Sequence, residues 1–178
     1  MAAAPTLLSI DEYLRTSFRP DADYVDGEIE ERNLGEFEHA RLQYLLSVYF
    51  GSREKLWSIQ GVVEQRIRVA ERRVRIADFA LLRADAPRER VTLTPPLLCV
   101  EILSPEDRMN RILRKASEYL EFGSHEVWII DPGARRIVQV DALSTVERTE
   151  GTISLSGTPI TFPLDRLFSA LDRRPASK

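Results

Sequence analysis

The sequence has little cysteine, no long hydrophobic run and no large excess of either charge. Its single cysteine, Cys99, lies in the apolar run L-L-C-V, so no disulfide can form within the chain. The absence of a disulfide predicts a reducing compartment. No polar neighbour would lower the pKa of the thiol, so we expect Cys99 to be a core residue and not a nucleophile. No run approaches the roughly 18 apolar residues of a membrane span, and the first residues lack the basic flank of a secretory signal. We therefore expect a cytoplasmic protein without a membrane segment.

The net charge of −3 excludes a general attraction to nucleic acid, so any such binding must come from local clusters. Residues 66–75 carry five arginines, and residues 108–115 carry four basic side chains. With Arg135 and Arg136, these clusters are candidates for contacts to the phosphates of a duplex. The alternative for each cluster is an ordinary solvated surface.

Capping and periodicity predict three helices in the first 123 residues. Ser9 and Glu12 have capping-box spacing, which predicts a short helix over residues 10–16. A second helix is predicted over residues 36–50, ended by Gly51, with an apolar face of Phe37, Ala40, Tyr44, Leu45 and Val48. A third helix, closed by Gly123, is predicted from Met109, Ile112, Leu113, Ala116 and Leu120.

The remaining patterns predict strands. Asp26-Gly27 indicates a hairpin, and strand-like runs cover residues 61–69, 73–82 and 97–103. Residues 126–141 read as a strand, a turn and a returning strand, followed by weaker alternation near Ile153 and residues 159–164. The order is helix, hairpin, helix, three strands, helix and two strands. It predicts an α/β fold, a mixed β-sheet flanked by helices, in a single domain over residues 1–178 without internal repeats.

Two of the predicted strands each carry one acid in an apolar run. Asp78 interrupts R-I-A-D-F-A-L-L-R, and Glu101 interrupts L-L-C-V-E-I-L. Burying an unpaired carboxylate is costly, so each acid needs a partner. If the two strands are neighbours and both acids face the same way, a divalent cation such as Mg²⁺ would relieve their repulsion. Salt bridges to the nearby arginines are an equally good explanation at this point.

The helix that follows Glu101 adds cations to this arrangement. Arg108, Arg111 and Lys115 are spaced by three and four residues, so they share a stripe distinct from the apolar face. A lysine or arginine there could offset the charge of a phosphoryl transition state or orient attacking water. This spacing favours a site for phosphate chemistry.

Longer segments resemble one known family. Residues 100–132, V-E-I-L-S-P-E-D-R-M-N-R-I-L-R-K-A-S-E-Y-L-E-F-G-S-H-E-V-W-I-I-D-P, resemble the signature of the Uma2 family, a bacterial group with a PD-(D/E)XK restriction-endonuclease-like fold. The segment R-V-R-I-A-D-F-A-L-L matches the family's R-x-R-x-P-D segment, and E-F-E-H-A-R-L-Q-Y-L-L matches its first core helix with a histidine. With Y-V-D-G-E-I-E, the resemblance covers the chain from about Ser9 to Phe168.

The resemblance implies a role for each matching position. Asp78 and Glu101 would be the two acids that hold Mg²⁺, with Mn²⁺ as a substitute, and the Ile102 carbonyl would be a third ligand. Leu103 stands where the general nuclease motif has lysine, and in this family the lysine comes from the following helix, which matches Lys115. His39 matches the family's helix histidine, and the alternative for it is an ordinary surface histidine.

The chain also departs from the family pattern. Ala77 stands where the motif has proline, which contributes no ligand. Asn110 and Arg111 stand where relatives often have an acid, so the resemblance favours one metal over two.

The leading hypothesis is therefore a Mg²⁺-dependent endonuclease that hydrolyses DNA phosphodiester bonds. One alternative is a nuclease fold that binds DNA or a protein partner without cutting, and another is a hydrolase of a different phosphate substrate. The resemblance also implies a homodimer, with a contact near Trp128 and Val138 unless those residues are buried in the core.

Overall fold

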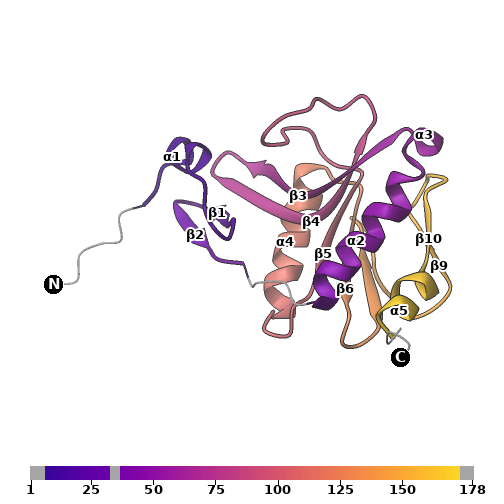
Figure 1. Ribbon diagram of the computed structural model, residues 1–178. Helices are drawn as coiled ribbons and strands as arrows, with labels where there is room; N and C mark the ends of the chain where they lie inside the picture. Colours follow the sequence, from indigo (N-terminus) through magenta and orange to yellow (C-terminus); the bar gives the residue numbers. More distant parts are fainter. Residues whose placement is uncertain (1–6, 33–36, 173–178) are drawn as a thin grey trace, which may run out of the picture.

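The computed structural model describes residues 7–32 and 37–172 and has the predicted fold class (Figure 1). Its helices are α1 (Ile10–Arg15), α2 (Phe37–Gly51), α3 (Glu54–Trp57), α4 (Met109–Phe122) and α5 (Leu164–Asp172). The Ser9–Glu12 capping box and the Gly123 C-cap form as expected. The sequence patterns missed α3, and α5 begins where the last predicted strand-like segment ends.

The strands form one large mixed sheet and one small pair. They are β1 (Asp23–Val25), β2 (Glu28–Glu30), β3 (Ile59–Ala70), β4 (Arg73–Arg83), β5 (Leu98–Ile102), β6 (Glu126–Asp131), β7 (Arg136–Val140), β8 (Thr145–Arg148), β9 (Thr152–Ser154) and β10 (Thr161–Pro163). The large sheet has the order β2-β1-β4-β5-β6-β7-β8, and β3 also pairs with β4. Its described pairings are antiparallel except for β5 with β6. The small pair is β9 with β10.

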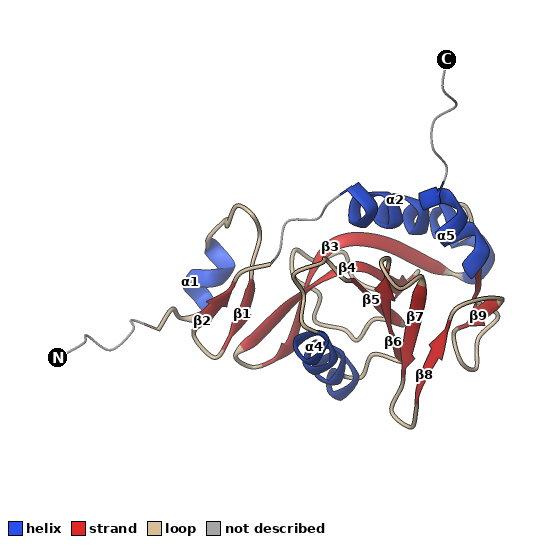
Figure 2. Cartoon of the chain, turned by 90° about the horizontal axis from the view of Figure 1, so that it is seen from below, coloured by secondary structure: helices blue, strands red, loops and turns tan. Residues whose placement is uncertain are grey.

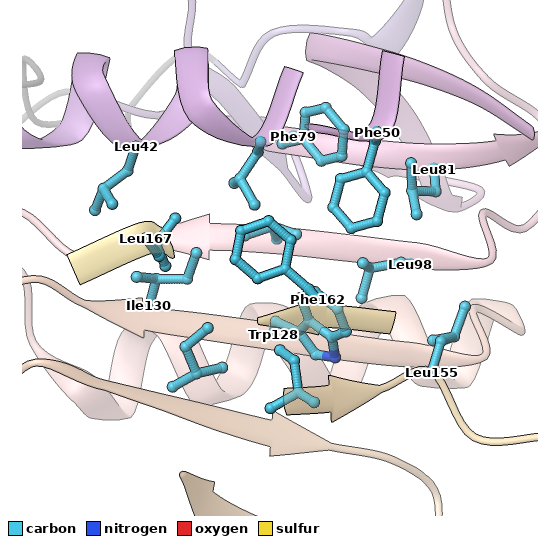
Figure 3. Close-up of a cluster of buried hydrophobic side chains, with 14 of the residues drawn as sticks. Leu42, Phe50, Phe79, Leu81, Leu98, Trp128, Ile130, Leu155, Phe162 and Leu167 are labelled. Carbon is cyan, nitrogen blue, oxygen red and sulfur yellow. The ribbon is translucent and has the colours of Figure 1, made fainter. Parts of the chain in front are cut away.

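Helices cover both faces of the large sheet, as Figure 2 shows: α2 and α5 lie on one face and α4 on the other. The core under α2 and α5 is rich in aromatic rings and joins both helices to β4, β5 and β6 (Figure 3). Phe50 from α2 stacks on Phe79 from β4 with ring centroids 5.5 Å apart. The smaller core under α4 contains Cys99, Ala116 and Tyr119.

The predicted apolar face of α2 is wrong. Its buried side chains are Leu42, Leu46 and Phe50, whereas Phe37 and Tyr44 are 78% and 57% exposed. Because α2 has apolar residues around its whole circumference, periodicity alone allowed two faces, and the sheet selects the one that carries Phe50. The selected face also turns His39 and Gln43 toward β4.

A gap along one edge of β4 positions the candidate site. On this edge β1 pairs with residues 73–74 of β4, and β5 pairs with residues 79–81. Side chains satisfy the backbone of Ile76 in the gap: its N–H donates to Asp23 (2.8 Å), and its carbonyl accepts from Lys115 (3.1 Å). Buried backbone groups need hydrogen-bond partners, and in this gap polar side chains take the place of a neighbouring strand.

Cys99 is fully buried, and burial raises the pKa of its thiol well above the usual range. We therefore expect no reaction with a thiol reagent such as dithionitrobenzoate in the folded protein, and one equivalent of reaction after unfolding in urea. Absorbance at 412 nm measures both values. Rapid labelling of the folded protein at pH 8 would contradict this burial.

In the part of the chain that the structure describes, no helix has the length and apolar character needed to cross a membrane.

Candidate active site

The two mid-strand acids lie on neighbouring strands. β4 and β5 are antiparallel, with Phe79 opposite Val100. Continuing this register by one residue places Asp78 opposite Glu101, so both side chains point to the same face of the sheet. Both acids line a cavity of about 30 Å³, roughly the volume of one water molecule. Its wall also contains Ile102, Lys115 and His39. The structure thus brings all five sequence-predicted site residues together.

Asp78 is buried, and both of its carboxylate oxygens have partners. Arg32 donates to Oδ1. The Ile102 backbone N–H donates to Oδ2 at 2.7 Å, and His39 Nε2 lies 3.2 Å from the same oxygen. Burial favours the protonated form, but the His39 hydrogen bond and the Arg32 charge outweigh it and hold the pKa of Asp78 below its usual value. Asp78 is therefore a carboxylate at neutral pH.

Glu101 is equally buried but differs in its electrostatics. Lys115 Nζ donates to Oε2 and the Tyr119 hydroxyl donates to Oε1, each at 2.8 Å. Burial raises the pKa of Glu101 to about 7; Lys115 opposes this rise, while the nearby charge of Asp78 adds to it. The two acids thus have pKa values displaced in opposite directions, which is common where carboxylates serve chemistry.

Lys115 is a buried cation between two acids. Its Nζ lies 2.8 Å from Glu101 and 3.5 Å from Asp23 Oδ2. Burial would lower the pKa of Lys115, but the charges of Asp23 and Glu101 outweigh that effect and raise it. The amine therefore stays charged and is fixed at the wall of the cavity.

Sequence reasoning missed five residues of this network: Asp23, Arg32, Gln43, Glu64 and Tyr119. Gln43 follows His39 by four residues, and Tyr119 follows Lys115 by four, so helix spacing could have placed each beside its partner. The other three come from separate parts of the chain. Only the fold brings Arg32 to Asp78, Glu64 to Arg32 and Asp23 to Lys115.

The donors present suit a hard cation such as Mg²⁺. Two carboxylates and a backbone carbonyl are oxygen ligands, and Mg²⁺ commonly uses one or two carboxylates and completes its shell with water or phosphate oxygens. Within residues 7–32 and 37–172, no three His, Cys, Asp or Glu side chains are arranged to hold a metal by themselves. A metal here would therefore depend on water or substrate for part of its coordination.

A wider groove adjoins this cavity. Its volume is about 270 Å³, and it shares His39, Ser104 and Asp107 with the smaller cavity. Asp131 and Glu38 also line it, next to Pro105 and Pro132. The three shared residues place the groove directly beside the cavity that the acids line.

Several arginines proposed for duplex contacts instead pair with acids of the same chain. Arg66 pairs with Asp21, and Arg75 pairs with Asp23, Glu30 and Glu118. The turn arginines Arg135 and Arg136 also have acidic partners. Because Arg66 and Arg75 are buried, they cannot form the expected phosphate-binding surface.

The proposed dimer contact also fails at its named residues. Trp128 is fully buried and Val138 is 8% exposed, since both side chains pack into the cores beside β6 and β7. Neither can face a second subunit, and the homodimer itself stays a prediction.

The family model Uma2, described as "Putative restriction endonuclease", matches residues 10–160. The chain belongs to the Uma2 family. The matched region includes all five predicted site residues of the Uma2 resemblance and all elements of the large sheet. A search among curated proteins gives no match.

Among solved structures, the chain is similar to one described as a "putative nuclease belonging to DUF820" from Anabaena variabilis. The two share 20% sequence identity with a TM-score of 0.81, over 92% of this chain and 99% of the other. At this identity the likeness shows only the fold of this Uma2 chain. Its chemistry must be argued from the site residues.

Proposed function

We propose that this protein is a metal-dependent endonuclease that hydrolyses DNA phosphodiester bonds. The observation that carries the proposal is the pair of buried acids, Asp78 and Glu101, facing one cavity with Lys115 in its wall. Membership of a family described as "Putative restriction endonuclease" supports DNA as the substrate.

In this proposal Asp78 and Glu101 hold Mg²⁺, or Mn²⁺ in its place, with the Ile102 carbonyl as a third protein ligand. When bound, the ion would supply Lewis-acid stabilisation of charge on the phosphate and a more acidic water. The buried site suits this chemistry, because fixed charges act more strongly where water is excluded.

Lys115 and His39 have distinct roles in the proposal. Lys115 is charged and fixed 2.8 Å from Glu101, so it can orient the attacking water or stabilise negative charge on the phosphate. His39 hydrogen-bonds Asp78 and lines both the cavity and the adjoining groove, so it can orient that acid and contact a substrate entering from the groove.

Cleavage of supercoiled plasmid DNA tests the proposal. We expect nicked or linear product with Mg²⁺ or Mn²⁺, and none with EDTA. Glu101→Gln removes a proposed metal ligand with almost no change in side-chain size, so it should lower the cleavage rate at least about 100-fold. Equal cleavage by the parent and Glu101→Gln proteins would show that another site, or a contaminant, cuts the DNA.

The non-cutting module remains the second candidate, because the structure already gives both Asp78 oxygens protein partners. Calorimetry distinguishes the two functions. Saturable Mn²⁺ binding that Glu101→Gln abolishes favours the enzyme. Salt-sensitive DNA binding without any metal binding favours the module.

A further inference from the structure

Arg32 lies between two acids at the cavity. It follows β2 and donates one nitrogen, Nη2, to Asp78 and the other, Nη1, to Glu64. Its side chain is 15% exposed, compared with 5% for Asp78 and 44% for Glu64. The guanidinium therefore links a buried acid to one near the surface.

The partners of Asp78 differ in how easily they can leave. The Ile102 N–H belongs to the end of β5 and is fixed by the backbone of the sheet. Arg32 instead reaches Oδ1 through a long side chain from the segment after β2. A cation that binds Oδ1 must therefore displace Arg32, because two positive groups cannot share one oxygen at low cost.

Glu64 can hold the Arg32 guanidinium at the site after it leaves Asp78. It lies in β3 between Val63 and Gln65, which pair with Phe79 and Ala77, so it is opposite Asp78. Its backbone has φ = +49°, a conformation that non-glycine residues rarely adopt. Gln43 Nε2 donates to Glu64 Oε1 (2.8 Å) and to the Asp78 carbonyl (2.7 Å), which stabilises this arrangement. Such backbone strain is most common at functional sites.

We propose that Arg32 exchanges partners during the reaction. Without metal it neutralises Asp78; when a divalent cation binds Asp78, Arg32 stays on Glu64 and offers its released N–H groups to the scissile phosphate. The planar guanidinium fork matches phosphate oxygens, which makes arginine suited to both partners. The inference rests on the proposed function and assigns Arg32 as its phosphate-binding residue.

The first measurement is Mn²⁺ affinity by calorimetry. Removing a competitor that occupies Asp78 in most molecules should tighten binding, so Arg32→Gln should lower the Kd for Mn²⁺ about tenfold. Arg66→Gln is the matched control, because Arg66 also pairs with an acid, Asp21, but neither residue lines the cavity. It should change the Kd less than about twofold. Unchanged or weaker binding by Arg32→Gln would overturn the inference.

A double-mutant cycle with Glu64→Gln tests whether Glu64 acts through Arg32. In the protein that keeps Arg32, Glu64→Gln should leave Arg32 on Asp78 and so weaken Mn²⁺ binding. Glu64→Gln should have no effect on Mn²⁺ binding in the Arg32→Gln protein. An equal loss of affinity in both backgrounds would mean that Glu64 attracts the metal directly, which contradicts the partner exchange.

The second half of the inference concerns the phosphate. At saturating Mn²⁺, Arg32→Gln should cleave plasmid DNA at least about 100-fold more slowly than the parent, despite binding metal more tightly. Arg32→Lys should restore part of the rate, because lysine keeps the charge but lacks the fork. Full cleavage by Arg32→Gln would overturn the phosphate role. If the parent itself does not cleave DNA while the affinities change as expected, the proposed function fails and the competition between Arg32 and metal stands.

Discussion

Asp78→Asn should abolish metal-dependent cleavage, with a loss of at least about 1,000-fold, or roughly 4 kcal/mol of transition-state stabilisation. Asparagine has nearly the shape of aspartate but no charge, so it removes the proposed ligand and keeps the packing between β4 and β5. Arg32 would retain Glu64 as its partner. Calorimetry measures the loss of Mn²⁺ binding, and plasmid cleavage measures the loss of activity. Thermal unfolding shows whether the fold is kept.

Asp21→Asn is the matched control for this substitution. Asp21 also pairs with an arginine, Arg66, but neither residue lines the cavity. Its removal should leave metal binding and cleavage unchanged. If Asp78→Asn cleaves within about threefold of the parent, Asp78 is a structural ion-pair partner and the proposed metal site is wrong.

Local patterns in the sequence predicted the scaffold of the site. Alternation and apolar runs located β4 and β5, and helical spacing located α4, because each signal lies within one element. The two acids were recognisable because a carboxylate in an apolar strand needs a partner. The pairing of β4 with β5 brings Asp78 and Glu101 to one face of the sheet, a condition that the sequence had left open.

The charged partners were beyond the reach of local patterns. Arg32 is 46 residues from Asp78, and Arg75 is 52 residues from Asp23, so these pairs exist only once β1 and β4 are joined. Composition likewise could not show that the arginines of residues 66–75 divide between buried ion pairs and the surface. That division follows from strand parity and from where acids of other elements lie.

Arg75→Met should be the most destabilising of the charge substitutions considered, lowering the free energy of unfolding by about 3–5 kcal/mol. Arg75 is 1% exposed and is the centre of a network that joins β4 to the hairpin and to α4. Its Nε and Nη2 donate to Glu118 at 2.5 and 3.0 Å, and its Nη1 lies 3.2 Å from Asp23. Methionine fills the space but leaves two buried carboxylates without their main counter-ion. Urea unfolding followed by tryptophan fluorescence measures the loss.

Arg73→Met provides the comparison, because Arg73 lies two residues away on the same strand and also contacts Glu118, at 3.5 Å. Its side chain is 38% exposed, so water can replace its contacts and the loss should stay below about 1 kcal/mol. The contrast between neighbours separates burial of charge from the number of ion pairs. Equal effects of the two substitutions would mean that the network around Arg75 is hydrated. Lys115 shares Asp23 with Arg75. A hydrated network would therefore also hold Lys115 less firmly beside Glu101 than its proposed role requires.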